Sequence, residues 1–306
     1  MEVPKVQKKG IVEVQKKGGL FFMFFGSNVL FRAPRLTTQD PTFENGIWKD
    51  IKHAVVLDIS YNGMMECFKE GNALLGGRLS TDLVSVHDPD EYLAQVEEDS
   101  EQYRQRLQDI LDAYRALFDL KSQGLVTSVG IGAKCPKIIE FVVNHCPLDW
   151  VMMACVITPY VHTAATQLLL KRLAGDNIHV INAGVFHGGF LVGEPYFNYA
   201  LADSASVPEL FKWRETFFAV CAECGHTPAA VCVQFSFRFP AICSVALNAD
   251  CPQRVIDNYN LVYGPPYGSH ITTTTASSTV VESDNTSGDE WDVVWSRLLT
   301  AGLTTF

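Results

Sequence analysis

Hydrophobic and polar positions along the middle of the chain follow a pattern typical of repeated strand–helix units. Short apolar runs, rich in Val and Ile, are each followed by a longer stretch with helical periodicity. Strands and helices that alternate at this spacing form parallel sheets with right-handed crossovers, so the fold class is α/β. Strands are expected at Asp82–Val86, Val126–Gly132, Asp149–Ile157, Ile178–Ala183 and Ile242–Leu247.

The helices between these strands carry recognisable end signals. Glu91–Gly124 is predicted to be one long helix, closed by a glycine of the kind favoured just past a helix C-terminus. Thr227 before Pro228 predicts a capped helix start, because the threonine hydroxyl can accept a bond from a free backbone amide. Helices are also expected at Pro136–Asn144, Thr163–Ala174, Glu209–Gly225 and Pro252–Val262.

The N-terminal residues depart from this pattern. Residues 1–36 contain VQKKG twice, at Val6–Gly10 and Val14–Gly18, and we expect an atypical leader that is not part of a packed core. Leu20–Phe25 is apolar and follows several lysines, which suggests a signal peptide. It is shorter than the usual apolar region, about 7 to 15 residues, and no A-x-A site follows. A buried strand or a poorly fitting leader is therefore favoured.

The C-terminal residues depart from it in two ways. Residues 263–290 are rich in Ser and Thr, which predicts a disordered linker between residues 37–262 and the end of the chain. Residues 291–306 place apolar side chains at 291, 294, 295, 298 and 299, the period of an amphipathic helix. We expect this helix to pack back on the domain.

Composition narrows the class of protein. The chain has 306 residues, 47% of them hydrophobic, and a formal net charge of -10. This is enough for one large domain, and an acidic chain is a poor partner for nucleic acid. The nine cysteines are odd in number and irregularly spaced, which indicates reduced thiols and a cytoplasmic protein. No apolar run reaches the roughly 18 to 20 residues of a membrane span.

Several segments resemble one known family. Asp58–Met65 is similar to a DYSYDGxMRS motif, and Arg78–Asp90 to RLGLDRIDIVYIHDPD. Ala113–Gly132 follows AYPALxxLRxEGVVxAIGVG, and Asn182–Gly193 follows GGVFNSGFLTG. These motifs, in this order, resemble the aldo-keto reductases, and within them the sugar and pyridoxal dehydrogenase branch. The resemblance implies a (β/α)8 TIM barrel. Because only five strand–helix units are found, we expect it to be incomplete at the N-terminus.

The resemblance also implies a chemistry. Members of the family transfer a hydride between NADP or NAD and a carbonyl or sugar lactol, without a metal. A tyrosine acts as general acid beside a lysine paired to an aspartate, and a histidine stabilises the developing oxyanion. By position, His87 is the histidine, and the alternative is a buried core histidine with its hydrogen bonds satisfied. The aspartate, tyrosine and lysine are not found: Tyr61 belongs to another motif, and Lys16, Lys17 and Lys49 lack the right context.

The elements that hold the cofactor are better preserved. Gly184, Val185 and Phe186 follow the strand after which the family's backbone wraps the pyrophosphate. Asn248, Arg254 and Asn258 surround the start of the last barrel helix, where the adenosine end binds in the family. Arg254 could bind a 2′-phosphate through both guanidinium arms, and the alternative is a solvent-exposed helix residue with no ligand.

Two positions depart from the family pattern. Lys134 stands where an asparagine holds the carboxamide, and Ile157 stands where an aromatic ring stacks on the nicotinamide, with Tyr160 three residues on. His187 and His226 lack metal-ligand spacing, and Cys221 and Cys224 form a lone CxxC inside a predicted helix with no second pair. All four are interpreted as structural.

The sequence therefore predicts an NAD(P)-dependent oxidoreductase that acts on a sugar lactol or small carbonyl compound. Its expected partner is a small molecule, and the sequence indicates no oligomeric state. The alternative is a catalytically impaired or truncated relative with at most a binding role.

Overall fold

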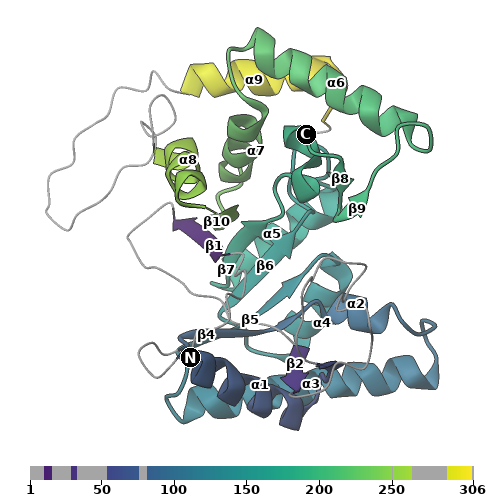
Figure 1. The fold of residues 1–306 in the computed structure, drawn as a ribbon, viewed down its shortest axis with the longest axis vertical. Coiled ribbons are helices and arrows are strands. Elements are labelled where there is room, and N and C mark those ends of the chain that lie inside the picture. The colour runs from purple at the N-terminus through teal and green to yellow at the C-terminus, as the bar shows by residue number, and fades with distance from the viewer. Residues whose placement is uncertain are drawn as a thin grey trace, which may run out of the picture. The chain divides into compact units, whose positions relative to one another are not determined.

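A computed structural model of the chain describes residues 10–15, 29–32, 54–75, 81–249, 251–263 and 288–304 (Figure 1). Leu20–Phe25, Lys16, Lys17, Lys49 and most of the Ser/Thr-rich stretch lie outside these residues. The chain divides into two compact units, Phe22–Met152 and Met1–Phe21 with Met153–Phe306. We call them the β4–β5 unit and the β7–β10 unit after their central strands, and each is described by itself.

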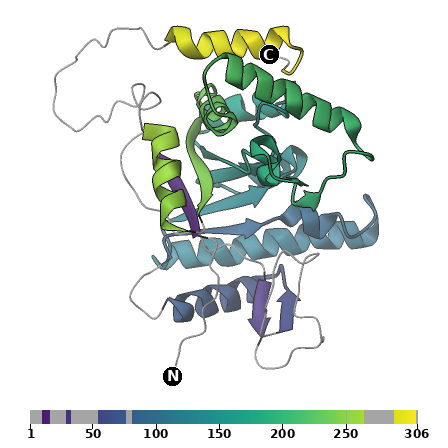
Figure 2. The same cartoon turned by 45° about the horizontal axis from the view of Figure 1, so that its top comes forward.

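The β4–β5 unit is built on two parallel strands. β4 (Leu83–His87) and β5 (Ser128–Ala133) run side by side, with Leu83 opposite Ser128 and His87 opposite Gly132. A separate antiparallel pair is formed by β2 (Val29–Arg32) and β3 (Ala54–Leu57). The helices are α1 (Tyr61–Leu74), α2 (Pro89–Leu93), α3 (Glu101–Ser122) and α4 (Pro136–His145), and α1 lies along α3 (Figure 2).

The long helix expected at Glu91–Gly124 is two helices, so that prediction was wrong. α2 ends at Leu93, and α3 begins only at Glu101. Ser100 stops the helix from extending backwards because it is the N-cap of α3: its hydroxyl accepts a bond from the Tyr103 amide at 3.0 Å. Asp99 before it adopts a left-handed conformation. The C-terminal signal was right, since Gly124 has φ +71° directly after α3.

Close packing joins the strands and helices of this unit. Tyr114 of α3 is fully buried and donates a hydrogen bond from its hydroxyl to the Gly130 carbonyl at 3.2 Å. A side chain on Gly130 would lie 2.2 Å from the Trp150 ring, so only glycine fits there. The Asp149 carboxylate accepts bonds from the Lys121 ammonium at 2.6 Å and from the Val129 amide at 2.7 Å. These contacts connect α3, β5 and the residues just before β6 (Trp150–Ala154).

The β7–β10 unit is built on β7 (His179–Ala183) and β10 (Ile242–Ala249), which are parallel. β6 ends in this unit, and α5 (Ala164–Gly175) connects it to β7. A 3-10 helix, η1 (His187–Val192), and a hairpin of β8 (Tyr196–Phe197) and β9 (Ala200–Leu201) follow β7. The remaining helices are α6 (Pro208–Glu223), α7 (Pro228–Phe237), α8 (Pro252–Tyr263) and α9 (Gly288–Thr300). All five expected strands are therefore present, at slightly shifted bounds.

Two segments of the expected leader are strands: β2, which pairs with β3 as described above, and a first strand, β1. β1 (Gly10–Gln15) pairs antiparallel with β10, with Gly10 opposite Ala249 and Gln15 opposite Ser244. The duplicated VQKKG overlaps this strand, and the expectation that these residues take no part in a packed domain was wrong for Gly10–Gln15. A strand on this edge satisfies backbone groups of β10 that would otherwise be unpaired.

The C-terminal helix packs on its own unit, as its periodicity predicts. Trp291 stacks on His226 with ring centroids 4.5 Å apart, and Trp295 meets Phe235 of α7 edge-on at 5.7 Å. After the helix, the Leu303 carbonyl accepts a bond from the Trp213 indole of α6 at 3.2 Å. α9 and α6 lie side by side in both views (Figures 1 and 2).

Among the described helices, none alone has the length and apolar composition of a membrane span. α6 and α7 meet those criteria only when taken together, and they are bent by 88° where they join.

Candidate functional site

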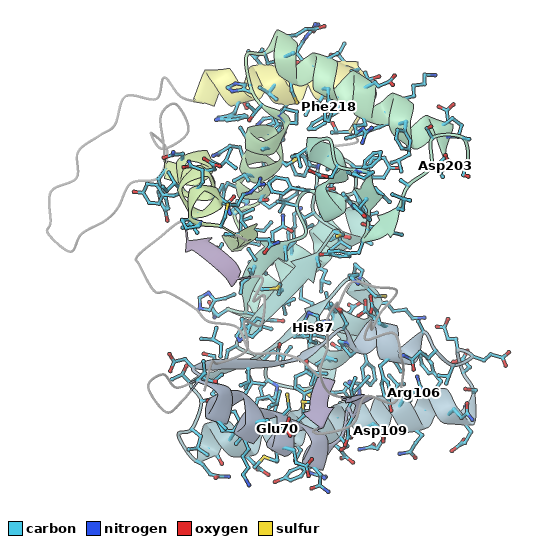
Figure 3. All side chains as sticks on the ribbon, viewed as in Figure 1. Glu70, His87, Arg106, Asp109, Asp203 and Phe218 are labelled. Carbon is cyan, nitrogen blue, oxygen red and sulfur yellow. The ribbon has the colours of Figure 1, made fainter. Side chains whose placement is uncertain are left out.

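His87 is the last residue of β4, at the carboxyl end where barrel enzymes carry their chemistry (Figure 3). Half of its side chain is exposed (50%), whereas the four residues before it on the strand are buried. Gly132 lies opposite His87 on β5, and a Cβ there would come within 3.3 Å of the ring carbon Cδ2. The alternative of a buried core histidine does not apply, because the strand presents the ring at its exposed end.

Asp88 lies directly beside the histidine. Its Oδ2 is 3.3 Å from His87 Nδ1, and its own backbone is left-handed, with φ +48°. The Asp88 amide donates to the Gly132 carbonyl at 2.7 Å, which fixes this turn at the end of the strand pair. Burial raises the pKa of the Asp88 carboxyl, and the charges of His87 and Lys134 act in the opposite direction.

Lys134 lies in the same cluster of charges. Its ammonium is 3.9 Å from Asp88 Oδ2 and pairs more closely with Glu91. Asp90 supports the backbone here, because its Oδ2 accepts bonds from the Lys134 and Cys135 amides at 3.0 and 2.8 Å. The lysine noted in the sequence as a departure from the family is therefore a neighbour of the Asp88 carboxylate, close to His87.

The described tyrosines of the β4–β5 unit are poorly suited to donate a proton. Tyr61 donates to Asp119 at 2.8 Å, and this hydrogen bond raises its pKa. Burial together with a bond to Asp109 raises the pKa of Tyr92 to about 12. Burial also raises the pKa of Tyr103 and of Tyr114. A catalytic acid needs a pKa close to the working pH, so none of these phenols is prepared for that role.

The carboxyl ends of β7 and β10 bring the expected cofactor residues to one edge. The two strands are parallel, with Val245 opposite Asn182. The loop of Gly184, Val185 and Phe186 therefore leaves the sheet where Asn248 also lies. Val185 is buried and joins one apolar cluster with Phe186 and with residues of α7, β10 and α8: Val233, Val245, Leu247 and Val262. That cluster fixes the loop against the last strand and helix.

Gly184 has the backbone that a close-fitting ligand loop requires. Its φ is +59°, and a Cβ there would lie 2.6 Å from Cys155 Sγ. Only glycine can occupy such a position without strain, and its bare backbone can be approached closely. Because Cys155 occupies the space where a Cβ would lie, a ligand could approach Gly184 only from the other side of its backbone. The side chain of Val185 is buried, so this residue could contact a ligand only through its backbone.

The start of α8 presents one cation. Arg254 is the third residue of α8 and is exposed, as Asn248 is on the strand before it. Asn258 is buried, and its side-chain amide donates to the Asn248 carbonyl at 3.0 Å. Asn258 therefore positions the turn, whereas Arg254 can reach a phosphate at the helix start.

Sequence reasoning missed a buried polar network around His187. This residue is fully buried, with Nε2 2.8 Å from Thr158 Oγ1 and Nδ1 2.6 Å from Asn198 Oδ1. The Thr158 hydroxyl oxygen also accepts a bond from the Val161 amide at 3.0 Å. Because Asn198 Oδ1 can only accept, Nδ1 carries the proton and Nε2 accepts from threonine. Burial lowers the pKa of His187, which keeps the ring neutral. We call these side chains the Thr158–His187–Asn198 relay.

The other positions singled out in the sequence have structural roles in the part of the chain that the structure describes. Ile157 is fully buried, so its side chain offers no surface for stacking. Tyr160 is packed edge-on against Trp213 at 4.9 Å and Phe197 at 5.5 Å. Burial raises the pKa of Cys221 to about 12, which makes this thiol unreactive. Within the described ranges no group of three or more His, Cys, Asp or Glu is arranged to hold a metal ion.

Comparisons with known proteins agree with these observations. A family model described as "Aldo/keto reductase family" matches residues 49–263. A pyridoxal 4-dehydrogenase from Microbacterium luteolum is 27% identical over 233 residues, which cover 74% of this chain and 64% of the relative. A D-threo-aldose 1-dehydrogenase from a Pseudomonas species is 24% identical over 203 residues, which cover 66% and 57%. The chain thus spans less than two thirds of the length of both.

The solved structure of a glycerol dehydrogenase from Gluconobacter oxydans has the same fold. Its TM-score is 0.51 at 13% identity, with 85% of this chain and 70% of that chain covered. The likeness and the family match confirm the predicted (β/α)8 fold class.

Proposed function

We propose a function for this chain from one premise: it belongs to the aldo/keto reductase family. The chain is an NAD(P)-dependent oxidoreductase that acts on a sugar lactol or a small carbonyl compound. The curated relatives it resembles are dehydrogenases of pyridoxal and of an aldose, which supports this substrate class. The observation that carries the proposal is His87, half-exposed at the carboxyl end of a barrel strand beside Asp88.

The β7–β10 unit holds the cofactor in this proposal. The backbone of the loop at Gly184, Val185 and Phe186 would lie along the pyrophosphate, and Arg254 would bind the phosphate at the adenosine end. A nicotinamide cofactor held there would supply or accept the hydride. The protein's part is to hold the dinucleotide at the edge of β7 and β10, where the apolar cluster under Val185 keeps the loop in place.

His87 acts on the substrate oxygen. A His87 ring protonated on both nitrogens directs Nδ1–H at Asp88 and Nε2–H at a carbonyl or lactol oxygen, and the bond that Nε2–H donates stabilises the charge that develops during hydride transfer. Gly132 leaves room for the ring in this position. Removing one such donor typically lowers kcat about 10²- to 10³-fold.

A second candidate function is a binding protein with impaired catalysis. It is favoured by the tyrosines of the β4–β5 unit, whose described members all have raised pKa values. General acid catalysis is typically worth about 10²- to 10⁴-fold, so its loss would leave cofactor binding with little turnover.

One set of measurements separates the two. The full chain is titrated with NADPH by fluorescence, and then assayed for NADPH consumption with an aldehyde and for NAD⁺ or NADP⁺ reduction with an aldose. The oxidoreductase is supported by turnover that His87→Gln abolishes while the NADPH affinity stays the same. Binding without turnover in the unmodified chain supports the impaired relative, and absence of NADPH and NADH binding rejects both.

A further inference from the structure

The loops that follow β6 and β7 contain an unusual number of left-handed residues. Cys155, His187, Asn198 and Tyr199 have φ values of +60°, +49°, +48° and +68°, although none of them is glycine. Such conformations cost free energy and persist only where the surrounding structure holds them, and they gather at ligand sites. Cys155, His187 and Tyr199 each have an atom close to Gly184, the glycine assigned above to the cofactor loop. Asn198 and Tyr199 are also the two central residues of the β8–β9 hairpin, where a two-residue turn requires left-handed backbone.

The Thr158–His187–Asn198 relay keeps the loop after β6 and the β8–β9 hairpin in place. His187 connects the loop after β6, through Thr158, to the β8–β9 hairpin, through Asn198. The Asn198 amide also donates to the His187 carbonyl at 3.1 Å, so the hairpin turn is bound to the histidine twice. Phe197 stacks on the imidazole with ring centroids 4.8 Å apart and an interplanar angle of 9°. The position of the hairpin is thus determined by His187.

The result of this arrangement is that Tyr199 lies over the cofactor loop. A Cβ placed on Gly184 would be 3.6 Å from the Tyr199 hydroxyl oxygen and 2.6 Å from Cys155 Sγ, so the phenol hydroxyl lies close to this glycine beside Cys155. The Tyr199 side chain is nevertheless 45% exposed, which leaves it accessible to a ligand. Cys155 lies against the same glycine, with Sγ 3.6 Å from the Gly184 carbonyl oxygen.

We propose that Tyr199 contacts the bound dinucleotide, with His187 and Asn198 as the residues that position it. This inference rests on the proposed function, because it takes the loop at Gly184 to bind the pyrophosphate. A phenol donates a hydrogen bond to a phosphate oxygen, and bonds to a charged acceptor are stronger than bonds between neutral groups. The ligand class is therefore a pyrophosphate-linked nucleotide held over Gly184.

Fluorescence titration of the full chain with NADPH tests the contact. Tyr199→Phe removes only the hydroxyl and is expected to raise the Kd for NADPH about 5- to 10-fold, with Tm unchanged. Tyr196→Phe is the matched control, because Tyr196 lies on the same hairpin and is 47% exposed. It is expected to leave the Kd as in the unmodified chain.

A second variant tests the positioning role. Asn198→Gly keeps the left-handed turn, which glycine tolerates, and removes the acceptor for His187. It is expected to raise the Kd by a similar factor. In Asn198→Gly/Tyr199→Phe the second change should add almost nothing, because the hydroxyl is already displaced. A purely structural role would lower Tm in each variant without this non-additivity in Kd.

The outcomes distinguish this inference from the proposed function. If the unmodified chain binds NADPH and Tyr199→Phe binds it equally well, the contact is rejected and the cofactor proposal stands. Additive effects in the double variant reject the positioning role. If the unmodified chain binds neither NADPH nor NADH, the proposed function fails and this inference fails with it.

Discussion

The imidazole of His87 lies against the backbone of Gly132, its direct partner across β4 and β5. A Cβ at Gly132 would come within 3.3 Å of His87 Cδ2, closer than side chains normally approach. The glycine therefore determines where the ring can lie, and the Asp88 carboxylate 3.3 Å from Nδ1 determines how it is turned. Position and orientation of the candidate oxyanion donor thus come from two different neighbours.

Gly132→Ala is expected to displace the ring without unfolding the chain. We expect turnover to fall about 10-fold, since small misplacements of a catalytic group reduce rates strongly. The displacement is checked by NMR of the His87 ring, which requires no activity, and by thermal unfolding. Gly71→Ala is the control, because a Cβ at this helical glycine meets nothing within 4 Å. That change should stabilise α1 by roughly 0.5–1 kcal/mol. An unchanged His87 spectrum in Gly132→Ala would contradict the prediction.

Stability should fall in mild acid because of His187. The pKa of His187 is lowered in the folded chain by burial, so the unfolded state binds a proton at a higher pH, near the usual histidine pKa of 6.5. The contribution of the neutral ring is therefore complete above that pH and is lost as the pH falls toward the folded pKa. The ring contacts Thr158, Asn198, Tyr160 and Phe197, which carry no charge at these pH values.

The measurement is the urea midpoint of unfolding between pH 8 and pH 5. His187→Gln replaces the ring with an uncharged amide, and we expect it to be less stable at pH 8 but to lose less stability on acidification. If the urea midpoint falls equally with pH in His187→Gln and in the unmodified chain, this histidine does not cause the pH dependence.

Features that depend on residues close together in the chain could be predicted from the sequence, whereas contacts between residues far apart in the chain could not. The five strands and most helix ends were predictable, because Val/Ile runs, Gly124 and Thr227 act within a few residues. The Thr158–His187–Asn198 relay could not be predicted. His187 bonds to Thr158 and Asn198, which are 29 and 11 residues away in the chain, and its own neighbours in the chain are glycines and an aromatic residue. β1 was missed because its partner, β10, lies more than two hundred residues along the chain.

The candidate site was predictable only where a local motif carries it. His87 follows from the strand it ends, and Gly184 from the turn that only glycine can make. The place of Lys134 beside Asp88 depends instead on how the loops after β4 and β5 pack, which no local pattern encodes.

Asp149 should matter more to stability than its partner Lys121. The carboxylate accepts bonds from both the lysine and the Val129 amide, and the ion pair itself is about one third exposed. Asp149→Ala leaves a backbone amide without its acceptor and should cost about 2 kcal/mol, whereas Lys121→Met should cost less than about 1 kcal/mol. Urea denaturation checks both. Asp149→Asn, which keeps an acceptor, should lie between them, and equal losses in Lys121→Met and Asp149→Ala would refute this account.

Arg254 should decide between the two nicotinamide cofactors. It is exposed in the first turn of α8, where a guanidinium can bind a 2′-phosphate through two parallel hydrogen bonds. Arg254→Ala is expected to raise the Kd for NADPH about 10- to 100-fold, the loss typical of hydrogen bonds to a charged group, and to leave the Kd for NADH unchanged. Gln253→Ala is the matched control, because Gln253 is exposed in the same turn and bonds to Asp257 at 3.0 Å. If Arg254→Ala weakens NADPH and NADH equally, the arginine acts on a part that both cofactors share, and the 2′-phosphate assignment is wrong.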